Sequence, residues 1–362
     1  MKRLLLLGAG HAQLVVLAAL AKRRMADSEV LLVSAGEHPV YSGMVPGLVA
    51  GRYSHADCSV AVEPLAAAAG ARFVRGRAVA LDAAEHIVTL SDGQRIDYDL
   101  LSLNSGAEQD RARIPGAHTH ALFLRPLEAF LQLWPRARAL ADAEPIDVVV
   151  IGNGAAGVEI ALAVRASLGS GCTLSLVADG PVLPGYGPGV QGRARAALER
   201  RGVVVLPGRC TAIEAGHVAL GAMQVACDVP IVATGADAPG WLAGSGLALD
   251  AAGFVRVGPT LQSASHPNVF AVGDLSVRDD APHPRSGVYA VRAGPVLAEN
   301  LRRFEAGVKL RSHTPQRRSL NLLALGDGRA IASWGSWSLQ GRLTGWCKDR
   351  IDRAHIARYR LP

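Results

Sequence analysis

The chain has 362 residues, of which 49% are hydrophobic and 19% charged, and its formal net charge is +7. This composition excludes a disordered or fibrous protein and gives enough length for two or three domains. From Arg302 to Pro362 there are 13 Lys and Arg against 4 Asp and Glu, so the positive charge belongs to the C-terminal segment. Such a segment is either a solvated basic face or a contact for anionic lipid, nucleic acid or an acidic protein.

The N-terminus places Lys2 and Arg3 before an apolar stretch, as a secretory signal does. His11 and Gln13 interrupt this stretch, which disfavours a signal, and no segment reaches the roughly 18 to 20 apolar residues of a membrane span. The cysteines are an odd number without CxxC or metal-ligand spacing: Cys58, Cys172, Cys210, Cys227 and Cys347. They predict free thiols in a reducing cytoplasm and no metal site.

The first glycine-rich turn, Gly8-Ala-Gly10, lies between an apolar run at residues 4–7 and a predicted helix at residues 13–23. In a dinucleotide-binding unit, the first Gly of such a turn permits the tight bend and the second lets the backbone approach a pyrophosphate. Gln13 stands where a third Gly would complete the motif. This turn alone is therefore weak evidence for a nucleotide.

Short β-pieces follow the first unit's second strand, which we predict at residues 30–34. A loop at 41–53 precedes strands at 72–75, 78–82 and 87–90, and Asp92-Gly93 predicts a hairpin turn. The buried run 100–103 then ends at Asn104-Ser-Gly106-Ala.

The second glycine-rich turn, Gly152-Asn-Gly154-Ala-Ala-Gly157, is complete and follows a strand at residues 148–151. A helix at 156–166, a strand at 173–177, a helix at 191–201 and a strand at 203–206 come after it. The buried run 229–232 ends at Ala233-Thr-Gly235-Ala, as residues 104–107 end the first unit. The repeat of whole units predicts two bound nucleotides with electron transfer between them.

The C-terminal third begins with a strand that runs into Gly273-Asp274, and Gly287 opens a long apolar helix that ends near residue 303. Strands at 320–324 and 330–334 and a helix at 344–358 predict a small third domain. We expect Trp334 and Trp337 to share one strand face in its core. The helix carries an apolar stripe, which we expect to pack against the protein rather than lie on a membrane: Leu343, Cys347, Ile351 and Ala354.

These motifs in this order resemble the flavoprotein superfamily of pyridine nucleotide-disulfide oxidoreductases, which includes type II NADH dehydrogenases and sulfide:quinone reductases. Residues 41–53, 287–295 and 346–353 are similar to an NADH-dehydrogenase-like branch that is often fused ahead of selenide, water dikinase. The resemblance implies an α/β fold with two Rossmann-like dinucleotide-binding domains, for FAD and NAD(P)H, plus a small α+β C-terminal domain. The implied boundaries are 1–118 with 255–308 for the FAD domain, 119–254 for the NAD(P)H domain and 309–362 for a C-terminal interface domain.

The resemblance also implies roles for single residues. In the FAD unit, Asp274 would hold the ribityl chain, and the helix start at Gly287 and Val288 would stabilise negative charge at the flavin. The other expected FAD contacts are Gly8, Gly10, His11, Ala12, Ser34, Gly106 and Gly273. The expected contacts of the nicotinamide dinucleotide are Gly152, Gly154, Ala156, Gly157, Asp179 and Gly235. The expected catalytic residues are Glu159, which would orient the nicotinamide, and Met44 and Pro46, which would line the acceptor face of the flavin.

Three positions depart from the pattern of these relatives. Ser34 ends the second strand where many relatives place an acid for the adenosine ribose, so we expect Glu37 or solvent to compensate. Arg125 and Arg285 stand where the branch has Lys, which keeps the charge but changes the donor geometry. Val288 replaces a Gln that often faces the quinone in type II NADH dehydrogenases, which disfavours quinone as the acceptor.

The absence of a cysteine pair near the expected flavin restricts the possible reaction. A disulfide reductase and a sulfide:quinone reductase both need a cysteine pair, and the segment at residues 38–50 has none. We therefore predict hydride transfer from NADH to FAD and electron transfer to a small-molecule acceptor, either quinone or a selenium or sulfur compound. NADH is favoured over NADPH because Asp179 follows the second strand of the second unit without a basic neighbour.

An alternative function stays open at this point. Gln13 and Ser34 could mark a catalytically weak flavin-binding or nucleotide-binding partner of a selenium-metabolism enzyme such as selenide, water dikinase. The predicted location is the cytoplasm, with peripheral contact to the inner membrane face through the basic C-terminal segment as a second option. A homodimer also stays open. Nucleic acid is not expected as a partner, because basic and aromatic residues do not alternate.

Overall fold

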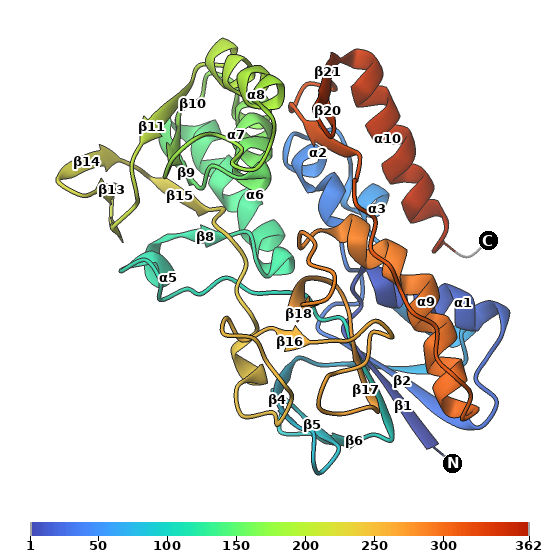
Figure 1. Cartoon of the computed structure of the whole chain (residues 1–362). Helices are drawn as coiled ribbons and strands as arrows, with labels where there is room; N and C mark the ends of the chain where they lie inside the picture. The colour runs from blue at the N-terminus through green and yellow to red at the C-terminus, as the bar shows by residue number, and fades with distance from the viewer. Residues whose placement is uncertain (1, 361–362) are drawn as a thin grey trace.

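The computed structural model describes residues 2–360. Two five-stranded sheets, in which every strand pairing is parallel, form the centres of two α/β units (Figure 1). A small antiparallel sheet with one long helix stands at the C-terminal end of the chain. The α/β fold class with its third small domain is thereby confirmed.

The first sheet has the strand order β17-β7-β1-β2-β3. Its strands are β1 (Lys2–Leu7), β2 (Ser28–Ser34), β3 (Ala71–Arg75), β7 (Leu100–Leu103) and β17 (Val269–Ala271). Strand β17 follows the second unit in the sequence, so the first unit is built from two separate segments of the chain. The exact domain boundaries stay a prediction.

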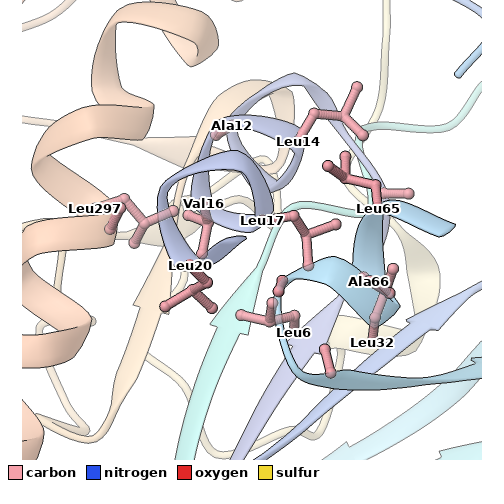
Figure 2. Packing of buried hydrophobic residues seen from close by; sticks show 14 of the residues in the cluster. Leu6, Ala12, Leu14, Val16, Leu17, Leu20, Leu32, Leu65, Ala66 and Leu297 are labelled. Atoms are coloured by element: carbon pink, nitrogen blue, oxygen red, sulfur yellow. The ribbon is translucent and has the colours of Figure 1, made fainter. Parts of the chain in front are cut away.

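Helices α1 (His11–Lys22), α4 (Val62–Ala68) and α9 (Gly287–Glu305) cover this sheet. Figure 2 shows Leu20 of α1 between the strand residue Leu6 and Leu297 of α9, with Leu17 on the side of Leu6 and Leu65. A Cβ on Gly294 would lie 2.6 Å from Val15 Cβ, so α9 approaches α1 as closely as glycine permits. This packing fixes the start of α9 next to the start of α1.

The opposite side of the first unit carries two minor sheets. They are formed by β4 (Ala78–Asp82), β5 (Ile87–Leu90) and β6 (Arg95–Asp97), and by β16 (Val255–Arg256) and β18 (Ser276–Val277). The turn predicted at Asp92-Gly93 is present: Gly93 has a φ of +87°, and Asp92 accepts a hydrogen bond from the Gln94 amide.

The second sheet has the order β11-β10-β9-β15-β8. Its strands are β8 (Leu122–Phe123), β9 (Ile146–Ile151), β10 (Cys172–Ala178), β11 (Val203–Pro207) and β15 (Val229–Val232). The helices of this unit are α5 (Ala117–His120), α6 (Leu127–Ala143), α7 (Ala155–Leu168) and α8 (Pro188–Arg200). A minor antiparallel sheet is formed by β12 (Ala212–Glu214), β13 (His217–Leu220) and β14 (Met223–Ala226). The long helix α6 was not predicted from the sequence.

The segment that was predicted as a loop, residues 41–53, is largely helical and joins the two units. It contains a 3₁₀ turn η1 (Ser42–Met44) and helix α2 (Val45–Val49), which precede α3 (His55–Cys58). Met44 belongs to the core of the first unit, whereas Val45 and Val49 belong to the core of the second. Pro46 lies within the first two residues of α2, where its missing N–H is tolerated.

The C-terminal domain has β19 (Asn321–Ala324), β20 (Ala330–Trp334), β21 (Trp337–Gly341) and α10 (Arg342–Ala357). Figure 1 shows α10 beside α2 and α3 of the first unit. Our expectation for Trp334 and Trp337 was wrong: they lie on two strands, directly opposite each other, and are 47% and 80% exposed. A turn with Gly335 at a φ of +58° separates the two strands.

The predicted inward stripe of α10 was also wrong. Leu343 and Ile351 are 67% and 50% exposed, and the helix instead buries Thr344, Asp352 and His355. Polar side chains therefore form most of the buried face of α10, which is the reverse of the usual amphipathic pattern.

Candidate functional site

The first glycine turn touches the end of the neighbouring strand. Gly8 has a φ of +92°, and a Cβ on it would lie 2.4 Å from Ser105 Cα. A Cβ on Gly10 would lie 2.4 Å from the carbonyl oxygen of Asn104. Only glycine fits at these two crossings, and α1 begins directly after them. The positive end of the α1 dipole therefore lies at the turn.

Asn104, at the end of β7, holds the start of α1. Its side chain is buried, and its Oδ1 accepts hydrogen bonds from the amides of Ala12 at 3.0 Å and Gln13 at 3.3 Å. Its Nδ2 donates to the Val272 carbonyl oxygen at 2.8 Å. Because the Ala12 amide is already paired, Gly10 and His11, which line the cavity above the turn, are better placed for phosphate contacts.

Gln13 compensates for the glycine that the first motif lacks. It is fully buried, and its Nε2 donates to the carbonyl oxygen of Ser102 at 2.8 Å and to the Ser102 hydroxyl at 3.1 Å. The hydroxyl of Ser102 can donate back to Gln13 Oε1 at 3.3 Å. These hydrogen bonds link α1 to β7, in addition to the close backbone contacts of Gly8 and Gly10 with the end of that strand.

A first cavity of about 200 Å³ opens above this turn. It is lined by Gly8, Gly10, His11, Ser34 and Gly106 of the predicted FAD contacts, together with Tyr41, Glu128 and His355. A Cβ on Gly106 would meet no protein atom within 4 Å among the described residues. The shape therefore has the features of a dinucleotide cradle: a glycine turn, a helix start and open space in front of both.

The adenosine end of this cavity differs from the expectation. Ser34 Oγ donates to the Gly36 carbonyl oxygen at 3.1 Å, so its hydrogen bond stabilises the turn that follows β2. Glu37, which was expected to compensate, forms an ion pair with Arg75 at 3.2 Å and is not a lining residue. Glu128, in the first turn of α6, lines the cavity and supplies a carboxylate there. Glu128 was missed because α6 was not predicted.

The second glycine turn has the complete geometry. Gly152 has a φ of +133°, and its Cβ would lie 2.5 Å from the Ala233 carbonyl oxygen. A Cβ on Gly157 would lie 1.8 Å from the carbonyl oxygen of Gly152, which explains the third glycine as a helix-packing position. A Cβ on Gly154 would meet no atom of the described residues within 4 Å. This glycine keeps the approach to the helix start open.

A second cavity of about 710 Å³ lies over this turn. Its lining includes the predicted nicotinamide dinucleotide contacts Gly152, Gly154, Ala156, Asp179 and Gly235, and also Asp274, which was predicted as an FAD contact and does not line the first cavity. Arg209, which follows β11, lines the same cavity as Asp179. Asp179 has no basic neighbour in the sequence, but the fold supplies Arg209 from the end of the next strand, and this removes the reason for favouring NADH over NADPH.

An ion pair stands where the two cavities adjoin. Arg125 Nη2 lies 2.9 Å from Asp274 Oδ2, and both residues line the second cavity, while Pro126 lines the first. A groove of about 790 Å³ contains Pro126 and Arg125 and so runs along both cavities. A ligand could therefore extend from the first turn towards Asp274 without crossing a core.

The predicted flavin contacts of α9 lie close to the first turn. A Cβ on Gly287 would lie 3.3 Å from His11 Nε2, so the start of α9 faces the start of α1. Gly273 lines a small cavity with Arg285, Ser286 and Tyr289. Val288 is partly buried in the first turn of α9. The start of α9 thus lies beside the start of α1, but neither Gly287 nor Val288 is among the residues that line the two cavities.

The predicted acceptor face is only partly open. Tyr41 lines the first cavity, whereas Met44 is fully buried and Pro46 is buried in α2, which packs against α7. The structure brings these residues to the junction of the two units but places neither Met44 nor Pro46 on a cavity wall. Their catalytic role stays a prediction.

Glu159 belongs to a largely buried polar cluster behind this segment, in which Glu159 and Lys348 are partly buried and Asp352 is buried. Its Oε1 accepts a hydrogen bond from the Ala324 amide of β19 at 2.7 Å. Burial raises its pKa to about 7, although nearby Lys348 and the Ala324 amide favour the ionised form. Lys348 Nζ donates to the Gly43 carbonyl oxygen at 2.7 Å and to Asp352 at 2.8 Å. The cluster places a carboxyl group that titrates near neutral pH next to the segment at residues 41–46.

All five cysteines are free, and all lie within residues 2–360. Burial raises the pKa of Cys58 to about 12, of Cys210 to about 11 and of Cys227 to about 12. Cys172 lies beyond the C-terminal end of α7, where its carbonyl oxygen accepts a hydrogen bond from Arg165, so it is remote from the second turn. The five thiols are unpaired, and burial makes Cys58, Cys210 and Cys227 poor nucleophiles, so the geometry offers no dithiol relay.

The C-terminal domain exposes a group of large apolar residues, which we call the tryptophan patch. These are Trp334, Trp337, Leu339, Leu343, Trp346 and Ile351, each 47% exposed or more. The guanidinium of Arg350 lies over the Trp346 ring at 5.7 Å. Within residues 2–360, no helix combines the length and the hydropathy that a membrane span requires.

A fold with two parallel sheets, each ending in a glycine turn below a cavity, defines an α/β oxidoreductase of the two-dinucleotide class. The family model described as pyridine nucleotide-disulphide oxidoreductase matches residues 2–294. The chain belongs to this family of FAD-dependent NAD(P)H oxidoreductases.

Individual relatives agree with this assignment. The chain is 28% identical over 314 residues to the type II NADH:quinone oxidoreductase NdhA of Mycobacterium tuberculosis, covering 75% of this chain and 66% of that protein. It is 24% identical over 265 residues to the demethylphylloquinone reductase NdbB of a Synechocystis strain, covering 70% of this chain and 66% of that protein. The structure of NDH2 from Plasmodium falciparum in complex with NADH superimposes with a TM-score of 0.82 at 12% identity, covering 98% of this chain and 97% of that one.

Proposed function

We propose that this protein transfers electrons from NADH or NADPH, through FAD, to a quinone. The observation that carries the proposal is the pair of adjoining cavities, each over its own glycine turn, with Arg125 and Asp274 between them and no thiol pair beside them. The residues fit FAD in the first cavity and the nicotinamide dinucleotide in the second. When bound, FAD supplies the two-electron chemistry, so that NADH, a proton and quinone give NAD⁺ and quinol.

The chain's own residues have positioning and proton-holding roles in this proposal. Gly8, Gly10 and His11 would bind the FAD pyrophosphate at the α1 start. Asp274, which is paired with Arg125, would bind the ribityl hydroxyls. Gly152 and Gly154 would bind the second pyrophosphate. The starts of α1 and α9 would stabilise negative charge on the reduced cofactor.

Glu159 is the proposed proton reservoir for the acceptor. Its raised pKa of about 7 lets it release and regain a proton near neutral pH, and its bond to the Ala324 amide fixes its position. Lys348 is held beside the same segment by Gly43 and Asp352. Met44 and Pro46 support this segment as buried packing residues and would act on the acceptor only indirectly.

Quinone is favoured over a selenium or sulfur compound for two reasons. The relatives named above are described as quinone reductases. The tryptophan patch offers indole and aliphatic groups with Arg342 and Arg350 beside them, a combination that suits the surface of an anionic bilayer, where quinones dissolve. Val288 at the start of α9 is the one feature that disfavours quinone. A selenide, water dikinase-like partner and a homodimer stay predictions.

The redox part of the proposal is tested by the colour of the purified protein. Reconstitution with FAD should give the flavin absorption bands, NADH should bleach them without air, and a soluble naphthoquinone should restore them. Bleaching without reoxidation by any quinone, but with reoxidation by polysulfide or selenite, would replace the proposed acceptor. A protein that takes up FAD but is not bleached by NADH or NADPH would contradict the proposal as a whole.

The membrane part is tested separately by sedimentation with phosphatidylglycerol vesicles. The double variant Trp337→Ser with Trp346→Ser should lose most of its vesicle binding, and neutral phosphatidylcholine vesicles should bind the wild type less. Leu140→Ser on α6 is a matched control, because Leu140 is 50% exposed but lies outside the patch. Equal binding of the double variant and the control would remove the patch from the proposal.

A further inference from the structure

The first cavity extends from the glycine turn to the carboxyl ends of β2 and β3. Ser34 and Ala35 line it after β2, and Gly76 and Arg77 line it after β3. In a dinucleotide-binding unit the adenosine ribose lies at this end, and a carboxylate after the second strand usually accepts a hydrogen bond from a ribose hydroxyl. This chain has Ser34 as the last residue of β2. The usual acceptor for the ribose is therefore absent from the first unit.

A carboxylate from the second unit lies beside the same strand end. Glu128, in the first turn of α6, lines the first cavity. A Cβ on Gly36, which follows shortly after β2, would lie 3.7 Å from Glu128 Cγ and 3.9 Å from Glu128 Oε1. The side chain of Glu128 is exposed, so a ligand in the cavity can reach it. The fold thus brings an acid from α6 to the place where β2 has none.

The Glu128 carboxylate is not engaged by the nearby arginines. Arg75, at the end of β3, forms its ion pair with Glu37, and Arg125 forms its ion pair with Asp274. Within residues 2–360, no salt bridge includes Glu128. An ionised carboxylate only accepts hydrogen bonds, and its two oxygens suit the two neighbouring hydroxyls of a ribose. Glu128 is therefore available to a ligand that carries such a pair of donors.

The position of Glu128 is set by the second unit. Phe130 and Trp134, on the same helix, are buried in the core of that unit, and Leu127 packs against this core. The start of α6 therefore belongs to the second unit, although its carboxylate lines a cavity of the first. A ligand that contacts both Gly10 and Glu128 would connect the two units.

We propose that Glu128 binds the adenosine ribose of FAD, in place of the acid that is absent from the end of β2. Its carboxylate would accept hydrogen bonds from the 2′ and 3′ hydroxyls. The inference rests on the proposed function in one respect, namely that FAD occupies the first cavity. It adds that the two halves of the cofactor are held by different units: the first binds the pyrophosphate, and the second binds the adenosine ribose.

The test compares FAD with an analogue that lacks the 2′ and 3′ hydroxyls of the adenosine ribose. The Kd of the flavin-free protein for each is measured by the change in flavin fluorescence on titration. Wild type should bind FAD about tenfold more tightly than the analogue. Glu128→Ala should bind FAD about tenfold more weakly than wild type does, and its Kd values for FAD and the analogue should agree within about twofold.

The direction of the change separates a hydrogen bond from a simple effect of charge. The pyrophosphate of FAD is anionic, so removal of a negative side chain without any contact to the ribose would lower the Kd for FAD. Glu37→Ala is the matched control, because Glu37 is an acid after the same strand but does not line the cavity. Its Kd for FAD should stay within about twofold of wild type, with the preference for FAD over the analogue retained.

The comparison of FAD with the analogue on wild type does not depend on the folding of a variant. A wild type that binds both equally would overturn the role of Glu128 and leave the proposed function standing. The same conclusion would follow if Glu128→Ala kept the wild-type preference for FAD, or bound FAD as tightly as wild type does. A wild-type protein that binds no FAD would overturn both the inference and the proposed function.

Discussion

The most direct test of the polar cluster is to replace Glu159 by the neutral isostere glutamine. Glu159→Gln keeps an acceptor for the Ala324 amide but cannot ionise. The pKa of Glu159 is raised from 4.5 to about 7 in the folded protein, mainly by burial. The unfolded chain therefore loses the proton first as pH rises, and the folded state is destabilised progressively between about pH 4.5 and pH 7.

The magnitude follows from the pKa difference. At about 1.4 kcal/mol per pH unit, ionisation of Glu159 lowers the free energy of unfolding by about 3 kcal/mol above pH 7. Most of this penalty is absent at about pH 5, because there the folded protein keeps the proton and the unfolded chain has released only part of its own. The stability gained by Glu159→Gln should therefore grow by about 2 to 3 kcal/mol between about pH 5 and pH 8.5.

The assay is urea unfolding of the FAD-loaded wild type and variant at both pH values. Glu144→Gln is the control, since Glu144 is exposed at the end of α6. A gain for Glu159→Gln that is the same at both pH values, as for the control, would refute the assignment of a protonated buried carboxyl to Glu159.

Further predictions concern the two turns. Gly157→Ala should raise the Kd for NADH more than tenfold and destabilise the protein by about 2 to 4 kcal/mol, because its Cβ would lie 1.8 Å from a carbonyl oxygen; an unchanged Kd by NADH fluorescence would count against this. Gln13→Ala should lower the free energy of urea unfolding by about 1 to 3 kcal/mol through the unpaired groups left on β7, and a neutral result would show that the hydrogen bonds are dispensable. Arg209→Ala should raise the KM for NADPH more than that for NADH, and Asp179→Ala should do the reverse; parallel changes for both nucleotides would remove these two residues from coenzyme selection.

The parts that were correctly predicted from the sequence are those where backbone geometry restricts residue choice. The strand-Gly turns at Gly8 and Gly152 need glycine because another backbone lies about 2.5 Å from their Cβ positions. The repeated strand ends at residues 104–107 and 233–236 follow from the same fold. Such constraints are visible in a single sequence because other residues cannot replace glycine there.

The parts that were missed depend on contacts between distant segments. The turn between Trp334 and Trp337 was not predicted, and both residues were placed in a core, whereas they form an exposed cross-strand pair. On α10 the apolar spacing pointed to the exposed face, because its buried face uses Asp352, His355 and Thr344. The contribution of Glu128 and Arg209 to the cavities arises only when helices and strands far apart in sequence are folded together.

The short segment with η1 and α2 also limits how this protein can move. Met44 is packed into the core of the first unit and its neighbour Val45 into the core of the second, so this segment ties the two units together. Opening them as rigid bodies would extract an aliphatic group from its surroundings and expose it to water. If the proposed function holds, we therefore expect the coenzyme to exchange over the surface of a preassembled body, with the distance between the two nucleotide sites set when the polypeptide folds.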